Sequence, residues 1–152
     1  MKPDLHEVAL ADLLPHASPM ILITNLIEAQ DEYVDCEVTI NEQSLFYDNK
    51  ACGVPAWVGI EYMAQSIGVH AGVQAMLASE PIKIGLLLGC RRFESEVVNF
   101  NLGQSLRIRA QKLYLEESGL AGYDCNIYCQ NKLLCSAKLN VFSPQSETDF
   151  FS

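Results

Sequence analysis

The first part of the chain carries two apolar patterns that predict a pair of strands. Residues 20–29 form an apolar run rich in Ile and Leu, which is typical of a buried strand. Residues 33–40 alternate between apolar and polar side chains, as expected for a strand with one buried face. The polar segment 30–32 between them predicts a turn. We therefore expect a β-hairpin, preceded by a short helix over residues 8–14 that ends at Pro15.

A long helix is predicted from Pro55 to about Ser79. Proline suits the first turn of a helix, because its fixed φ fits and its missing N–H is not needed there. The segment is rich in small residues, although a glycine inside a helix costs about 1 kcal/mol relative to alanine. These residues are Ala56, Gly59, Ala64, Gly68, Ala71, Gly72 and Ala75. So many small side chains predict that another surface approaches the helix closely on most sides.

The remainder of the chain predicts one strand after another. The apolar or alternating segments are residues 82–93, which Arg91 and Arg92 interrupt, 105–115, 123–130 and 133–142. Short polar turns at 116–119 and 130–132 predict antiparallel neighbours. The order is a hairpin, one long helix and four strands. It predicts a single α+β domain over residues 1–152, in which a curled antiparallel sheet wraps the helix.

Charge and hydropathy exclude two classes of function. The net charge of the 152 residues is -9, with only 10 Lys and Arg, which argues against a nucleic-acid-binding protein. The N-terminus has no apolar core of a signal peptide. The weakly polar stretch 54–79 contains Glu61, Gln65, His70 and Gln74, so we interpret it as a buried helix and not as a membrane span. We expect a cytoplasmic protein.

The cysteines do not follow a metal-binding or disulfide pattern. None forms a CxxC pair or stands at metal-ligand spacing from a histidine. Without a secretory signal, we expect reduced thiols in apolar positions and no metal site. The residues concerned are Cys36, Cys52, Cys90, Cys125, Cys129 and Cys135.

Glu61 is the residue that most strongly suggests chemistry. It lies early in the predicted helix, between the apolar residues Ile60 and Tyr62. Gln65 follows four residues later on the same helix face and could hydrogen-bond the carboxyl group. A desolvated carboxyl group held in this way would have a raised pKa and could donate a proton at neutral pH. The alternative is a glutamate at the helix surface or in a subunit contact, and the residues alone leave both open.

Four motifs, in order, give the chain a resemblance to a known family. Residues 14–23 (LPHASPMILI) resemble the LPHRYPFLLVD opening of the FabA/FabZ-type 3-hydroxyacyl-(acyl carrier protein) dehydratases. Residues 54–65 (VPAWVGIEYMAQ) resemble their MPGVLIVEALAQ helix start. Residues 88–93 (LGCRRF) and 103–106 (GQSL) resemble the following strand and the G-D-x-L turn. The GVPAW form is similar to the ApeP-type dehydratase subunits of aryl polyene clusters.

The resemblance implies a fold and a reaction. The fold would be a hotdog fold, and the reaction the elimination of water from a 3-hydroxyacyl thioester, in aryl polyene or fatty-acid-like biosynthesis. No cofactor is implied, since the substrate rides on the phosphopantetheine of an acyl carrier protein. By motif match, Glu61 would protonate the leaving hydroxyl and Gln65 would be its hydrogen-bond partner. Gly53 and Val54 fall where backbone N–H groups would hold the thioester carbonyl.

One departure from the family concerns the catalytic base. The histidine of the family's G-H-F-P-G segment falls on Tyr47, and no histidine lies between His16 and His70. His70 follows Glu61 by nine residues, so its side chain is expected to point to the opposite side of the helix. His16 matches a family histidine that is not the base. Tyr47 could contact the substrate, but residues of its loop also serve as turn formers. Either a related subunit supplies the base, in a heterodimer, or the base is unfamiliar.

Further residues are candidates for contacts with partners. Arg91 and Arg92 could steer an acidic acyl carrier protein, or could be solvated charges on a strand edge. Trp57 at the helix start could pack in the core or a dimer, or shape the acyl tunnel. A lone hotdog protomer leaves a sheet edge open, so a homodimer or heterodimer is expected. Rival functions are a non-catalytic partner subunit and an acyl thioesterase.

Overall fold

The computed structural model describes residues 10, 21–81 and 85–143. Most of the helix predicted over 8–14, together with His16 and the first part of the 14–23 motif, lies outside the described residues. Within them the elements follow in the order β1 (Asn25–Ala29), β2 (Tyr33–Thr39), β3 (Gly53–Pro55), the 3-10 helix η2 (Ala56–Val58), α2 (Gly59–Leu77), β4 (Leu86–Ser95), β5 (Asn99–Asn101), β6 (Ser105–Leu115), β7 (Leu120–Cys129) and β8 (Lys132–Phe142).

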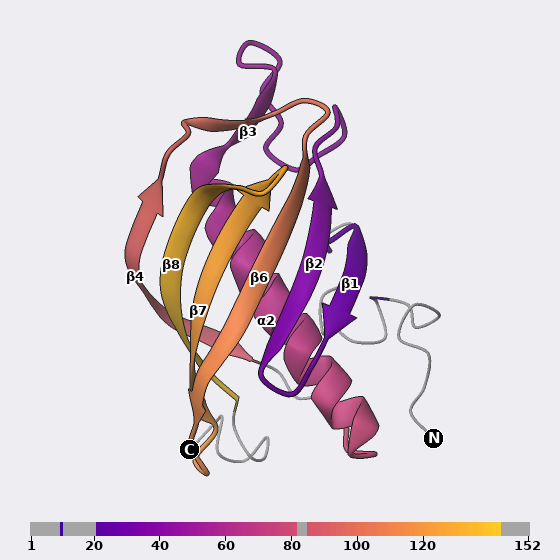
Figure 1. The fold of residues 1–152 in the computed structure, drawn as a ribbon, viewed down its shortest axis with the longest axis vertical. Coiled ribbons are helices and arrows are strands. Elements are labelled where there is room, and N and C mark those ends of the chain that lie inside the picture. The colour runs from indigo at the N-terminus through magenta and orange to yellow at the C-terminus, as the bar shows by residue number, and fades with distance from the viewer. Residues whose placement is uncertain (1–9, 11–20, 82–84, 144–152) are drawn as a thin grey trace.

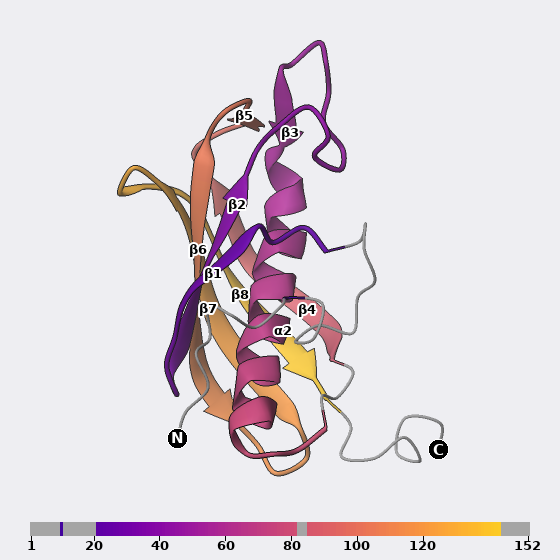
Figure 2. The ribbon, with the colours of Figure 1, turned by 90° about the vertical axis from the view of Figure 1, so that its right-hand side faces the viewer.

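The main sheet has six strands in the order β1-β2-β6-β7-β8-β4, and each neighbouring pair is antiparallel. Figure 1 shows this sheet curving across α2, and the side view in Figure 2 shows the helix lying along one face of it. The predicted hairpin is present as β1 and β2. The predicted α+β arrangement of a curled sheet around one long helix is therefore confirmed.

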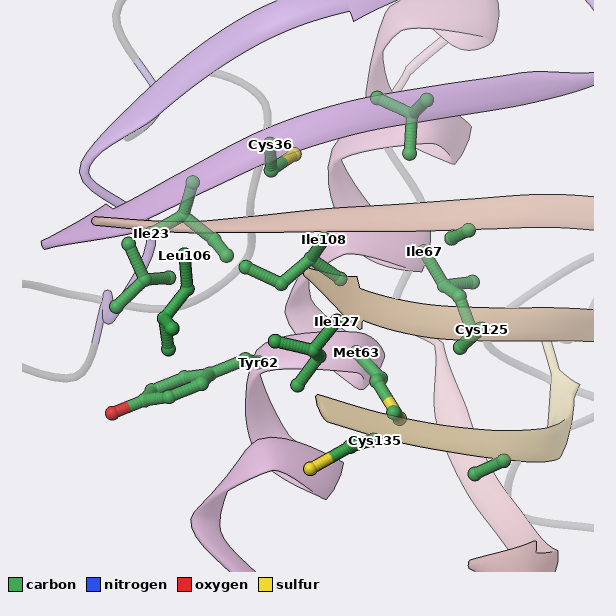
Figure 3. Packing of buried hydrophobic residues seen from close by; sticks show 14 of the residues in the cluster. Ile23, Cys36, Tyr62, Met63, Ile67, Leu106, Ile108, Cys125, Ile127 and Cys135 are labelled. Atoms are coloured by element: carbon green, nitrogen blue, oxygen red, sulfur yellow. The ribbon is translucent and has the colours of Figure 1, made fainter. Parts of the chain in front are cut away.

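The core lies between α2 and the inner face of the sheet. Cys36 of β2 pairs with Ile108 of β6, and both are fully buried against the helix (Figure 3). Met63 and Ile67 of α2 belong to the same buried cluster. At Gly59 an added Cβ would lie 3.0 Å from Ile127 Cδ1, so close packing on the sheet side explains this small residue.

The opposite face of α2 is less covered than the abundance of small residues predicted. Ala64 and Gly68 are half-buried and Ala71 is exposed. The prediction that another surface approaches the helix closely is thus correct on the side of α2 that faces the sheet. It is wrong for the outer side of α2 in the isolated chain. A helix face of small residues permits a flat, close contact with another surface.

Three local predictions need correction. β1 begins at Asn25, several residues later than the apolar run suggested, and Pro55 ends β3 instead of starting α2. Arg91 and Arg92 do not interrupt β4: the strand continues through them with a shift in its pairing to β8, and Arg92 takes a φ of +55°. An edge strand tolerates such a bulge because its other side has no ladder to maintain.

The short pairing of β3 with β5 was not predicted. It joins Gly53 to Asn101 and Val54 to Phe100, just before the helix begins. A Cβ at Gly53 would collide with the carbonyl oxygen of Phe100. Glycine is therefore required here by the close approach of two backbones, which no local pattern reveals.

Candidate functional site

Gln65 links the Glu61 carboxyl group to a second segment of the chain. Its Nε2 donates to Glu61 Oε1 at 3.1 Å, as the four-residue spacing predicted. Its Oε1 accepts a hydrogen bond of 2.7 Å from the backbone N–H of Leu22. Because the oxygen of the Gln65 amide faces Leu22, its NH₂ group faces Glu61. Gln65 is only 1% exposed, so its packing fixes the direction of this donor.

The structure shows where the Glu61 carboxyl group lies relative to solvent. The sequence left open a desolvated carboxyl group and a glutamate at the helix surface or in a subunit contact, and Glu61 is exposed in the isolated chain. It lies on the face of α2 that points away from the sheet, one turn after Trp57, which is 57% exposed. The sheet covers only one side of the helix. Burial of Glu61 would therefore need a further surface over the outer face of α2.

Trp57 belongs to an exposed aromatic pair at the start of the helix. Its ring centroid lies 5.1 Å from that of Phe46, which is 54% exposed. The expectation that Trp57 packs in the core of its own chain is wrong. Contact with a partner or with a substrate remains a prediction. Large apolar side chains exposed next to one another are typical of a binding surface.

Tyr47 and the start of the helix are joined by a tight loop. Asp48 and Gly53 form an antiparallel bridge, in which the Gly53 N–H donates to the Asp48 carbonyl over 3.3 Å. Asp48 Oδ1 accepts from the N–H of Lys50, so this side chain forms a turn. Tyr47 is half-buried, and desolvation raises the pKa of its phenol. Its hydroxyl therefore stays protonated at neutral pH.

Gly53 and Val54 are placed slightly differently from the prediction. Both lie in β3 and are buried, and the helical conformation starts later, at Ala56. The Gly53 N–H is engaged by Asp48 through a long hydrogen bond that a stronger acceptor could replace. The role of these backbone groups in holding a thioester carbonyl stays a prediction.

A groove lies beside Tyr62, the residue that follows Glu61. It has a volume of about 270 Å³. One wall contains Leu22, whose N–H binds Gln65, so the groove and the Glu61–Gln65 pair share a structural element. The lining residues are Ile21, Leu22, Ile23, Thr24, Val38, Thr39, Asn41, Gln43, Ser44, Leu45 and Tyr62. Sequence reasoning missed this groove, because its walls come from three segments far apart in the chain.

Arg91 and Arg92 are exposed on β4, at the edge of the sheet. Arg91 pairs with Lys138 of β8, which is also exposed, so a third positive charge lies next to the pair. Lys138 also pairs with Asp124 of β7, so a negative charge lies beside these three positive charges on a chain whose net charge is -9. Binding of an acidic partner to this cluster remains a prediction.

His70 has a structural role, as its direction on the helix predicted. It is 1% exposed, and its Nε2 donates to the Gln30 carbonyl at 2.7 Å. Its Nδ1 therefore accepts from the Tyr123 hydroxyl, at 2.8 Å. Burial lowers the pKa of His70, which favours the neutral ring that this network needs. Among the described residues it is the only histidine.

The cysteines mostly follow expectation. Cys36, Cys125 and Cys135 are buried, whereas Cys52 is exposed in the loop before β3 and corrects the prediction of an apolar position there. Within the described ranges, no group of three or more His, Cys, Asp or Glu could hold a metal ion. No helix in that part of the chain is long and apolar enough to cross a membrane.

Comparison with known proteins identifies the family. The sequence profile of the ApeP-like family, described as ApeP dehydratase, matches residues 8–152. The chain belongs to the ApeP-like dehydratase family. Its structure also resembles that of "The Dehydratase Heterocomplex ApeI:P from Xenorhabdus doucetiae", with a TM-score of 0.87, 30% sequence identity and coverage of 95% of each chain. The family predicted from the four motifs is therefore confirmed.

More distant structures share the fold alone. A hypothetical thioesterase with coenzyme A from Streptococcus pneumoniae TIGR4 has a TM-score of 0.62 at 14% identity, covering 80% of this chain and 88% of that one. The PaaI protein of Escherichia coli, from the phenylacetic acid degradation operon, has a TM-score of 0.60 at 13% identity, covering 77% and 80%. No curated protein matches the chain significantly. The hotdog fold of this ApeP-like chain agrees with the prediction.

Proposed function

We propose that this chain is one subunit of a 3-hydroxyacyl-(acyl carrier protein) dehydratase, in which Glu61 is the general acid. The observation that carries the proposal is the hydrogen-bonded chain from Leu22 through the buried Gln65 to the exposed Glu61. Membership of the ApeP-like dehydratase family supports the reaction class. The substrate would be carried on phosphopantetheine, so the reaction would need no further cofactor, and we place it in the cytoplasm.

The elimination requires two proton transfers. A base removes a proton from the α-carbon of the thioester, the electron pair forms the double bond, and the C–O bond to the 3-hydroxyl breaks. Glu61 would give its proton to the leaving hydroxyl, which departs as water. Gln65 would hold the carboxyl group in place throughout. Covering Glu61 with a second subunit would favour its protonated form, because desolvation disfavours the charged state.

The base would come from a related hotdog subunit. Tyr47 stands where the family carries its histidine, and its phenol stays protonated at neutral pH. The outer edge of β4 has no neighbouring strand among the described residues, and Leu86, Leu87 and Leu88 are exposed there. An open apolar edge favours a partner that continues the sheet. The similar Xenorhabdus structure is that of a dehydratase heterocomplex, which supports a heterodimer over a homodimer.

The acyl carrier protein would dock near the β4 edge. Arg91, Arg92 and Lys138 would offer positive charges to an acidic partner and to the phosphate of its prosthetic group. A non-catalytic role is the second candidate function, because Glu61 is exposed and no described histidine accompanies it. The thioesterase alternative has only the likeness of fold behind it.

The test is dehydration of a 3-hydroxyacyl-(acyl carrier protein), followed by mass spectrometry for loss of water. The chain is assayed alone and together with a histidine-bearing hotdog subunit. Activity is expected for the pair, little for either subunit alone, and loss of activity for the pair carrying Glu61→Gln. The matched control is Glu28→Gln, since Glu28 is an exposed glutamate on β1 that also accepts a bond from a glutamine, Gln30. Full activity of the Glu61→Gln pair would leave only the non-catalytic role.

A further inference from the structure

Tyr62 carries a buried hydroxyl group without a hydrogen-bond partner among the described residues. The side chain is 2% exposed, and its ring packs on Phe100, with 5.9 Å between ring centroids. Figure 3 shows the phenol oxygen directed away from Met63 and Ile127, out of the apolar cluster. Tyr62 also lines the groove described above. A buried tyrosine hydroxyl is usually hydrogen-bonded, so the unbonded hydroxyl of a groove residue suggests that a ligand accepts a hydrogen bond from it.

Three other polar side chains of the groove accept hydrogen bonds within the protein. Thr24 Oγ1 accepts from the Thr39 N–H at 3.0 Å. Ser44 Oγ accepts from the Asn41 N–H at 2.9 Å, and Asn41 Oδ1 accepts from the Gln43 N–H at 2.8 Å. These hydrogen bonds join residues of the groove lining to one another. The groove is thus lined by polar and apolar surface in about equal parts, and it contains one buried donor, the Tyr62 hydroxyl, that has no partner among the described residues.

The walls and volume limit the kind of ligand. Ile21, Leu22, Ile23, Val38 and Leu45 supply the apolar lining. A volume of about 270 Å³ is just below that of small-molecule sites, which span roughly 300–1,000 Å³, so it suits a short chain or a part of a larger ligand. Burial raises the pKa of Tyr62 to about 12, so the phenol acts as a donor at all physiological pH values.

We propose that this groove binds an aliphatic chain carrying one carbonyl or hydroxyl oxygen, and that Tyr62 selects for that oxygen by donating a hydrogen bond to it. That this chain is the acyl part of the dehydratase substrate rests on the proposed function. Tyr62 is then a specificity-determining residue, separate from Glu61. Since Leu22 forms both a groove wall and the contact to Gln65, occupation of the groove would also hold the Glu61 support in place.

The test uses 2-octanone, an eight-carbon chain with one carbonyl oxygen and no thioester. It is titrated into the full chain, and binding is followed by amide chemical shifts in NMR spectra. Shifts are expected at residues 22–24 and 43–45. Tyr62→Phe removes only the hydroxyl group, and we expect it to weaken binding about three- to tenfold, the range for one neutral hydrogen bond. Its melting temperature should stay equal or rise, because an unpaired buried hydroxyl is removed.

Tyr123→Phe is the matched control, since its buried hydroxyl is bonded to His70. It should lower the melting temperature and leave 2-octanone binding unchanged. Equal affinity of Tyr62→Phe and wild type, shifts confined to another part of the chain, or a drop in melting temperature like that of Tyr123→Phe would overturn the proposal. The probe needs no catalysis. If the subunit pair shows no dehydration while 2-octanone binding still depends on Tyr62, the proposed function is refuted and the binding groove stands.

Discussion

Gln65 donates a hydrogen bond to Glu61 one helical turn away, with 3.1 Å between Nε2 and Oε1. The same amide accepts from the N–H of Leu22, which lies 43 residues away in sequence. The first contact is local and follows from helix geometry. The second ties the helix to the segment before β1. A substitution at Gln65 therefore tests the fold and the site together.

Gln65→Met should lower both stability and activity. The methionine keeps most of the side-chain volume but leaves the Leu22 N–H without its acceptor, which costs about 1–3 kcal/mol. Urea unfolding measures the free energy, and the dehydration assay measures the loss of rate. Gln74→Met is the control on the same helix, because Gln74 is half-exposed and its bond to the Gln30 carbonyl is long, at 3.3 Å. Equal effects of the two substitutions would contradict a special role for Gln65.

His70 should make the fold less stable in mild acid. Burial lowers the pKa of His70 below its ordinary value of 6.5, which the unfolded chain retains. The unfolded state therefore takes up a proton first as the pH falls below 6.5, and the free energy of unfolding decreases until the folded-state pKa is reached. Urea unfolding at pH 7.5 and at several lower values measures the slope. His70→Gln should show a smaller slope over this window, and an identical slope would refute the assignment.

The Asp35–Arg109 pair should be the most sensitive ion pair on the outer face of the sheet. Arg109 binds the 3% exposed Asp35 through two hydrogen bonds of 2.8 and 2.7 Å, whereas Arg107 lies 3.6 Å away. Arg109→Met leaves a buried carboxylate with one distant partner and should cost about 3 kcal/mol. Arg107→Met should cost about 1 kcal/mol or less, since that pair is more exposed. Thermal and urea unfolding measure the loss of stability in each variant. A larger loss for Arg107→Met than for Arg109→Met would contradict the structure.

Gly53→Ala should disturb the start of the helix. The new Cβ would collide with the Phe100 carbonyl oxygen, so the β3–β5 pairing must shift, at a cost of about 1–3 kcal/mol. A loss of dehydratase activity beyond the loss of folded protein is expected, because this pairing places the first turn before Glu61. Gly89→Ala is the control, since a Cβ there meets nothing within 4 Å. Normal stability of Gly53→Ala would show that the backbones are not in close contact.

Local patterns predicted those features that depend on local geometry. The alternation over 105–115 matches β6, and the spacing of Glu61 and Gln65 gave their hydrogen bond, because helix and strand periods act over a few residues. Prediction was poorer where the chain departs from these periods. Pro55 fits the end of a strand as well as the first turn of a helix, and the bulge at Arg92 carries no composition signal.

The sequence by itself determined the fold class, the family and the pairing of Glu61 with Gln65. Only the tertiary structure decided that Glu61 faces outward, that Leu22 completes the Gln65 contact and that Tyr62 lines a groove. The reason is physical. A period along the chain shows which side chains share a face, but burial depends on which distant segment covers that face. That choice is set by sheet register and by packing between elements that sequence spacing does not connect.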